Sequence, residues 1–168
     1  NVALSVYYHG APVSSSFPST GNVHLIRINL PVTLPLNTTD SLTINYEGVP
    51  PAVSGQAEGY QKKSSAGYNY IYTLSESYED KDWWPCKNRL DDKADSIDII
   101  ITNPVAYKAA SNGLLQSEII AGNGTQKISH WKHRYPIATY FICFAVTNYT
   151  VFNNSVQLGN KNVPMVTY

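Results

Sequence analysis

Four carboxylates lie in a short segment just before two adjacent tryptophans. They are Glu76, Glu79, Asp80 and Asp82, and the segment continues through Trp83, Trp84 and Pro85 to Cys86. Such a charge run usually forms a solvated turn. A carboxylate held by a rigid neighbouring element can instead bind a cationic group of a ligand through a charge-assisted hydrogen bond. Both interpretations remain open from the residue types alone.

The histidines do not predict a metal site. His130 and His133 are three positions apart, and on a strand such positions point to opposite faces of the sheet. Zinc needs three or four converging ligands, and no His-Glu-x-x-His segment occurs. We therefore predict no metal ligands within this chain.

Nucleophilic catalysis is not indicated either. The chain has no Gly-x-Ser-x-Gly segment, and Cys86 has no histidine near it in sequence. Cys143 lies in an apolar run, which is typical of a buried thiol, although a Cys86–Cys143 disulfide stays open. We predict no catalytic residue in this chain.

The composition indicates a folded domain without a charged partner. The 168 residues are 43% hydrophobic and 14% charged, and 12 basic residues balance 12 acidic ones. This length predicts one domain spanning residues 1–168. Zero net charge gives no electrostatic footprint for nucleic acid, and no apolar run is long enough to span a membrane.

The residue pattern predicts an all-β fold, an antiparallel β-sandwich. Short apolar or alternating segments recur about every ten residues, and no segment has a helical period with caps. The expected strands cover residues 3–8, 23–30, 41–46, 68–74, 97–102, 107–111, 114–120, 127–132, 139–148, 156–158 and 163–166. Residues 48–67 are expected to form a long loop. Asn112-Gly113 predicts a hairpin with a primed turn, and Gly159-Asn160 a final strand pair.

The 13 tyrosines and 3 tryptophans allow a second kind of site. Exposed aromatic rings can stack on sugars, although strands and cores use the same residues. An independent carbohydrate-binding or adhesion module is therefore the alternative function, and a purely structural interaction domain is a third.

The order of several short segments resembles the amino-terminal domain of the aminopeptidase N family of zinc exopeptidases, in the version of Bacteroidetes-like secreted enzymes. No single segment is specific, but their order and spacing cover nearly the whole chain. The segments are Tyr46-Glu47-Gly48, Thr73 to Glu76, Trp84-Pro85-Cys86, Lys93-Ala94, Ile101 to Pro104, Ser111-Asn112-Gly113 and Pro136 to Ala145.

The resemblance implies a saddle-like β-sandwich that docks on a thermolysin-like catalytic domain of the same polypeptide. That domain would hold the zinc and the Gly-x-Met-Glu-Asn motif, neither of which is expected here, so this fragment alone would be inactive. The family's amino-terminal domain supplies one acidic or amide residue that binds the substrate's free α-amino group. It lies ten positions before the cysteine of the Pro-Cys pair, which gives Glu76.

The sequence departs from the family at several points. Lys81 replaces the family's arginine, and residues 87–90 replace its usual acidic stretch, so local contacts of this loop are expected to differ. The family's first strands have no counterpart before Asn1. The resemblance therefore also predicts an uncovered sheet edge that can self-associate.

Overall fold

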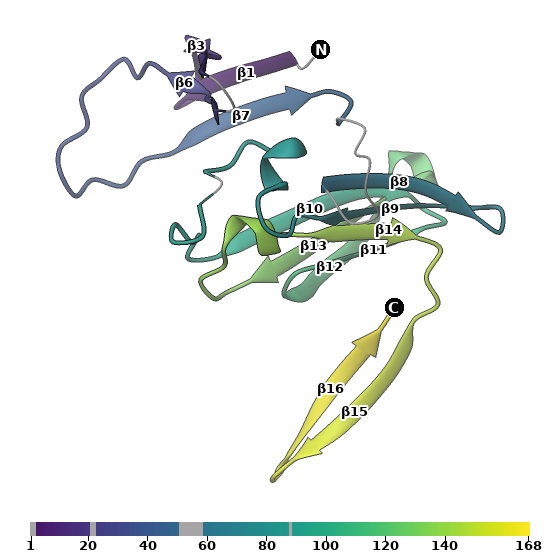
Figure 1. Cartoon of the computed structure of the whole chain (residues 1–168). Coiled ribbons are helices and arrows are strands. Elements are labelled where there is room, and N and C mark those ends of the chain that lie inside the picture. The colour runs from purple at the N-terminus through teal and green to yellow at the C-terminus, as the bar shows by residue number, and fades with distance from the viewer. Residues whose placement is uncertain (1–2, 21–22, 51–58, 88) are drawn as a thin grey trace. The chain divides into compact units, whose positions relative to one another are not determined.

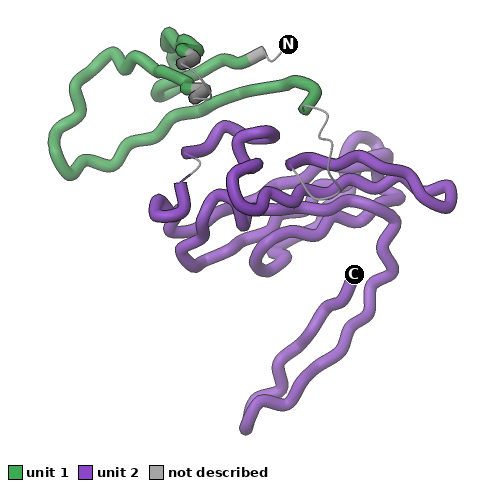
Figure 2. Tube along the Cα trace, in the orientation of Figure 1, with its two compact units in different colours: residues 1–51 green, residues 52–168 purple. Residues whose placement is uncertain are grey.

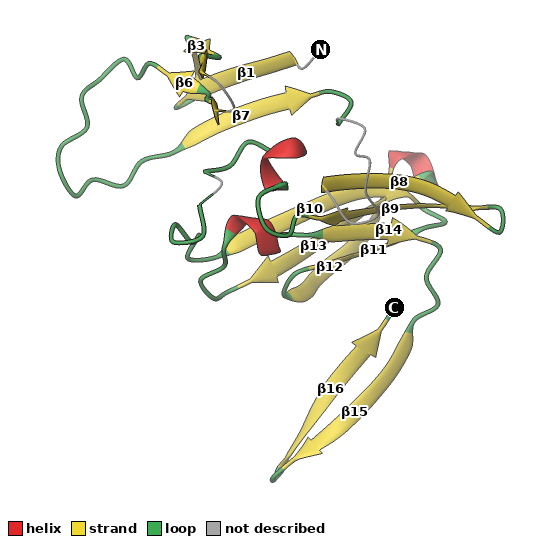
Figure 3. Ribbon diagram, viewed as in Figure 1, coloured by secondary structure: helices red, strands yellow, loops and turns green. Residues whose placement is uncertain are grey.

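The structure is a computed structural model that describes residues 3–20, 23–50, 59–87 and 89–168. Regular structure in these residues is almost entirely β-strand, with three short 3-10 turns, so the all-β prediction is confirmed (Figure 3). Contacts divide the chain into two compact units, residues 1–51 and 52–168 (Figure 2). The single domain over 1–168 stays a prediction.

Unit 1 is built on a three-stranded antiparallel sheet. Strand β1 (Ala3–Tyr8) lies between β2 (Ala11–Val13) and β7 (Leu42–Glu47), and Val6 of β1 is 2% exposed. The strand predicted over 23–30 is instead two short strands, because its backbone pairs piecewise with the segment before it. These pairs are β3 (Ser15–Ser16) with β6 (Arg27–Ile28), and β4 (Ser19–Thr20) with β5 (Val23–His24).

Asp40 ties the long segment before β7 to the end of β1. Its carboxylate accepts a hydrogen bond from the Tyr8 hydroxyl at 2.6 Å and one from the Ser41 backbone N–H at 2.7 Å. His9 Nε2 lies 2.6 Å from the same carboxylate, and the His9 ring stacks on Tyr8. The Tyr8 hydrogen bond, followed by that of His9, lowers the pKa of Asp40 to about 2.

This ionised carboxylate makes the stability of unit 1 depend on pH. The pKa of Asp40 is lower in the folded state than its ordinary value of 3.8, so its stabilisation is present above about pH 4 and is lost as pH falls toward 2. NMR signals of the Val6 and Ile44 amides, followed from pH 5 to 2, should show unfolding in that window. Asp40→Asn should be less stable at pH 5 and lack this pH step. Identical pH profiles for the two proteins would contradict the assignment.

The two larger antiparallel sheets of unit 2 lie face to face (Figure 1). The first has the order β11-β14-β9-β8 and the second the order β10-β13-β12. Their strands are β8 (Gly59–Ser65), β9 (Tyr68–Leu74), β10 (Ile97–Pro104), β11 (Lys108–Ser111), β12 (Leu114–Ala121), β13 (Gln126–His133) and β14 (Phe144–Thr147). The 3-10 turns are η1 (Asp80–Asp82), η2 (Gly122–Gly124) and η3 (Thr139–Phe141).

An ion-pair cluster joins the two sheets. Glu118 of β12 lies 2.8 Å from Lys108 of β11 and 3.5 Å from Lys127, whose side chain is 9% exposed. Burial alone raises the pKa of Glu118, but the Lys108 hydrogen bond and the Lys127 charge outweigh it, so the pKa lies below its usual value. The register places Tyr70 and Tyr72 of β9 on the same sheet face as Lys108. These tyrosines therefore point toward the other sheet and do not form an outward aromatic platform.

The predicted hairpin turn and the predicted long loop of unit 2 are both wrong. Strands β11 and β12 flank Asn112-Gly113 but belong to different sheets, so this turn is a crossover and not a hairpin. The loop predicted over 48–67 contains strand β8, which pairs with β9 along its whole length. Its residues 51–58 lie outside the described part of the chain. Among the described strands, β8 is an edge strand with a partner on one side only, in agreement with its polar sequence.

Residues 139–148, predicted as one strand, begin as the 3-10 turn η3 and become strand only at Phe144. Backbone bonds from Phe141 to Ala138 and from Ile142 to Thr139 close this turn. The predicted final pair is confirmed and longer than expected: β15 (Phe152–Leu158) pairs with β16 (Lys161–Thr167) around Gly159-Asn160. None of the helical turns in the described residues is long and apolar enough to cross a membrane.

Candidate functional site

Glu76 lies on an exposed turn directly after strand β9. The turn covers residues 76–79 and leads into η1, and the peptide bond between Glu76 and Ser77 is cis. Within the part of the chain that the structure describes, the Glu76 carboxylate has no hydrogen bond or ion pair. An exposed carboxylate without a partner is available to a cationic ligand.

The residues around Glu76 are fixed by packing. Ser75, which is 2% exposed, accepts a 2.9 Å hydrogen bond from Trp83 Nε1. The Trp83 ring packs edge-on against Phe144 at 5.5 Å and lies 5.8 Å from the ring of Trp84. The adjacent tryptophans therefore have a packing role: they hold the turn against strand β14.

The carboxylates after Glu76 do not form one solvated surface. Asp80 is fully buried: its Oδ1 accepts the Lys81 backbone N–H at 3.1 Å, and its carbonyl accepts the N–H groups of Trp83 and Trp84. Asp82 lies 3.7 Å from the Lys81 ammonium. Of the four acids, Glu76 is thus the one that faces solvent without an intramolecular partner among the described residues.

Several of the segments that carry the family resemblance converge on residues 137–144. Thr73 Oγ1 accepts a hydrogen bond from Phe144 N at 3.1 Å, and Ala94 forms an isolated bridge with Ile137. The Asn112 side chain donates to Phe141 O at 2.9 Å and accepts from Cys143 N at 2.7 Å. These segments therefore have a structural function in binding a single irregular segment.

Neither Cys86 nor Cys143 forms a disulfide bond. Burial raises the pKa of the Cys143 thiol, although its hydrogen bond with Asn112 acts in the opposite direction. A thiol with a raised pKa is a poor nucleophile at neutral pH, in agreement with a packing role.

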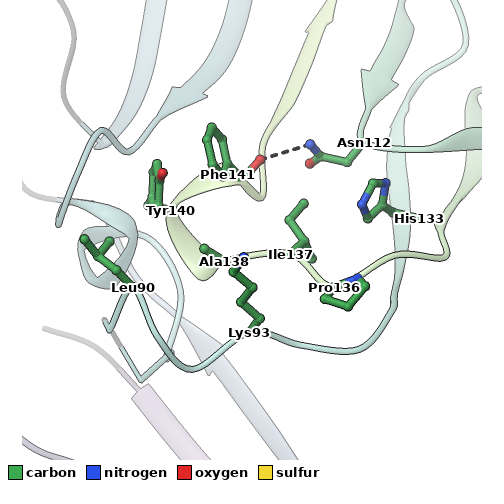
Figure 4. Close-up of a pocket in the computed structure, with 9 residues that line it drawn as sticks. All are labelled: Leu90, Lys93, Asn112, His133, Pro136, Ile137, Ala138, Tyr140 and Phe141. Carbon is green, nitrogen blue, oxygen red and sulfur yellow. Dashed lines mark hydrogen bonds between the residues drawn. The ribbon is translucent and has the colours of Figure 1, made fainter.

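A surface pocket of about 440 Å³ lies beside the convergent segment (Figure 4). Apolar side chains such as Pro136, Ile137 and Phe141 line most of it, and its ionisable groups are Lys93, His133 and Tyr140. The dashed line in Figure 4 is the hydrogen bond from Asn112 to Phe141. Glu76 is not part of this pocket, so the pocket is separate from the predicted site.

Metal binding has no candidate ligand set in the described ranges, where no group of three His, Cys, Asp or Glu side chains could hold an ion. His130 is instead bonded to Asp98 on the neighbouring strand, at 2.7 Å. Lys132 pairs with the same carboxylate. The described residues therefore do not fit a zinc ion.

Comparison with known proteins finds the fold but no close sequence relative. No protein-family profile and no curated protein sequence matches this chain. A two-domain M1 zinc metallopeptidase mutant bound to L-tryptophan matches with a TM-score of 0.75 and 22% identity, over 98% of this chain and 39% of that chain. An M1 zinc metallopeptidase from Deinococcus radiodurans matches with a TM-score of 0.72 and 22% identity, over 98% and 38%. A mutant of the Deinococcus radiodurans metallopeptidase bound to a Tyr-Ser-Ala substrate matches with a TM-score of 0.74 and 23% identity, over 98% and 37%.

These matches show that the chain has the fold of one part of M1 zinc metallopeptidases. It spans less than two-fifths of the length of each structure described above. The resemblance inferred from the order of short segments therefore agrees with the fold. A Bacteroidetes-like origin has no support in these matches.

Sequence reasoning missed two features of this region. Asp80 was grouped with solvated acids although it is fully buried, and Ser75 was not singled out although it anchors the turn. The residue types of this turn give no signal for the burial of Asp80, because the neighbouring Trp83 packs against Phe144, which lies far along the chain.

Proposed function

We propose that this chain is the non-catalytic amino-terminal domain of a zinc-dependent aminopeptidase, which releases amino-terminal residues from peptides. The fold match over 98% of this chain to 39% of an M1 zinc metallopeptidase carries the proposal. The whole aminopeptidase, of which this chain would be one domain, is the parent polypeptide. Its catalytic domain would hold the zinc, and this chain would dock on that domain.

In this proposal Glu76 anchors the substrate. A peptide's free amino terminus is an ammonium group, and a fixed carboxylate pairs with it through charge-assisted hydrogen bonds. Two observations support the role: the Glu76 side chain is exposed without an intramolecular partner in the described residues, and Ser75 beside it is held by Trp83. Gripping the amino terminus would let only the first peptide bond reach the catalytic centre, because the distance from the anchor to the reacting bond is fixed.

Mass spectrometry of a decapeptide incubated with the parent polypeptide tests the proposed activity. We expect a ladder of products shortened one residue at a time from the amino end. The same peptide with an acetylated amino terminus should remain intact, because it lacks the ammonium group that the anchor binds. Cleavage at internal bonds, or equal loss of both peptides, would refute the proposal.

A further inference from the structure

The hairpin of β15 and β16 has one apolar face that nothing in the described chain covers. Every residue of both strands is exposed, and the two strands form a sheet of their own (Figure 1). Cross-strand partners share a face, so the register separates the side chains into two sets. One face holds five apolar side chains, Phe152, Val156, Leu158, Val163 and Met165, whose exposed fractions run from 37% to 60%, together with Asn154, Lys161 and Thr167 near its edges and ends.

The opposite face of the hairpin is mainly polar. It carries Asn153, Ser155, Gln157 and Asn162, together with Pro164 and Val166. A two-stranded hairpin is at best marginally stable in water by itself. We therefore expect the apolar face of this amphipathic hairpin to be covered by another domain or protein.

The two outer edges of the hairpin differ. The two-residue turn at Gly159-Asn160 makes Leu158 and Lys161 a hydrogen-bonded pair, and pairs alternate along an antiparallel ladder. Pro164 falls in a non-hydrogen-bonded pair with Ser155, so its nitrogen, which has no hydrogen, faces outward. Pro164 thus blocks the outer edge of β16 to a further strand.

The outer edge of β15 carries no such block. The outward N–H and C=O groups of β15 are those of Asn153, Ser155 and Gln157, by the same alternation. A further strand can therefore be added to this hairpin on the β15 side only.

We propose that β15 pairs with an edge strand of a β-sheet in the catalytic portion of the parent polypeptide, and that the apolar face of the hairpin covers that portion's core. The inference rests on the proposed function, because it takes the partner from the longer polypeptide. The fold match supports this partner: it includes 98% of this chain, yet more than three-fifths of the matched metallopeptidase lies outside it. The apolar face of the hairpin is thus a candidate interface with the rest of the parent polypeptide.

At its base the hairpin is held to the second sheet. The Tyr168 ring lies 6.0 Å from the ring of Trp131, which is 6% exposed, and 6.0 Å from that of Tyr149. These edge-on contacts fix the end of the hairpin and leave its apolar face available to a partner.

Hydrogen exchange at single-residue resolution tests this inference without any activity measurement. We expect the amides of Asn153, Ser155 and Gln157 to exchange at least tenfold more slowly in the parent polypeptide than in the isolated 168-residue chain. Amides of Asn154 and Val156, which face β16, are paired in both forms and serve as internal references. Equal exchange of the outward amides in both forms would overturn the inference, even if the parent is an active aminopeptidase.

A pair of double variants separates face burial from a general effect of charge. Val156→Lys with Val163→Lys places two lysines across one strand pair on the apolar face, and should remove the protection of the outward amides. Gln157→Lys with Asn162→Lys places the same charges on the next pair, on the polar face, and should retain it. Protection that appears in the isolated chain and rises with its concentration would identify a second copy as the occupant, which also overturns the inference.

Discussion

Glu76→Ala in the parent polypeptide should lower kcat/KM for substrates with a free amino terminus by roughly 30- to 700-fold. Loss of a charge-assisted contact to the substrate ammonium costs about 2–4 kcal/mol of transition-state binding, and each 1.4 kcal/mol is a factor of ten. KM should rise and kcat should fall, because the anchor both binds the substrate and positions its first peptide bond. Steady-state kinetics with an aminoacyl anilide measure both constants.

Glu79→Gln is the matched control for this variant. It removes a charge from the same turn and retains an oxygen that can accept the Tyr78 backbone N–H, as Glu79 does at 3.1 Å. Its kcat/KM should stay within a few-fold of the wild-type value. A comparable loss in both variants would mean that the turn's overall charge matters and that Glu76 has no specific role.

Gly113→Ala should be the most damaging single-methyl change in the crossover between the two sheets. Gly113 has φ of +88°, and an added Cβ would lie 2.1 Å from the Lys132 carbonyl oxygen. A left-handed backbone costs an alanine about 1–2 kcal/mol, and forced overpacking typically adds about 1–3 kcal/mol. Urea denaturation should therefore show a loss of roughly 2–5 kcal/mol in the free energy of unfolding.

Gly67→Ala distinguishes the clash from the backbone effect. Gly67 has a similar φ of +82°, but nothing lies within 4 Å of an added Cβ. This variant should lose only the conformational part, about 1–2 kcal/mol. Equal losses at the two positions would show that β13 moves freely to accommodate the methyl group.

Strand positions with a clear hydrophobic signal could be predicted from the sequence. The ranges expected for β1 and β9 agree with the structure, because alternating or aromatic residues fill both strands and a glycine lies near one end of each, Gly10 after β1 and Gly67 before β9. Strand β10 was recognised as a continuous apolar run and extends two residues further, to Pro104. These signals lie within the sequence of each strand, so they can be recognised without knowing which strands pair with it.

Pairing between strands could not be predicted in the same way. Asn112-Gly113 has the composition of a hairpin turn, but the Asn112 side chain bonds Phe141 and Cys143, about 30 positions away. At this turn the chain passes from the sheet that contains β11 to the sheet that contains β12. Strand β8 carries Lys62 and Lys63 because only one of its edges is paired, and local polarity resembles that of a loop.

The candidate site likewise combines features that the sequence predicts with features that depend on contacts between distant residues. Glu76 was identified by its spacing from Cys86 in a resembling family, and its exposure is a property of the structure that no local pattern predicts. Burial of Asp80 depends on the packing of Trp83 against Phe144, a contact 61 positions apart in sequence that the residue types of this turn do not encode. The role of Glu76 stays a prediction.

The most direct test of the proposed function compares free and acetylated substrates in two forms of the parent polypeptide. The measured quantity is the ratio of kcat/KM for an aminoacyl anilide to that for its N-acetyl derivative. We expect a large ratio for the wild type and a ratio at least about 30-fold smaller for Glu76→Ala, because acetylation and the substitution remove the two halves of one ion pair. An unchanged ratio would show that Glu76 does not bind the α-amino group.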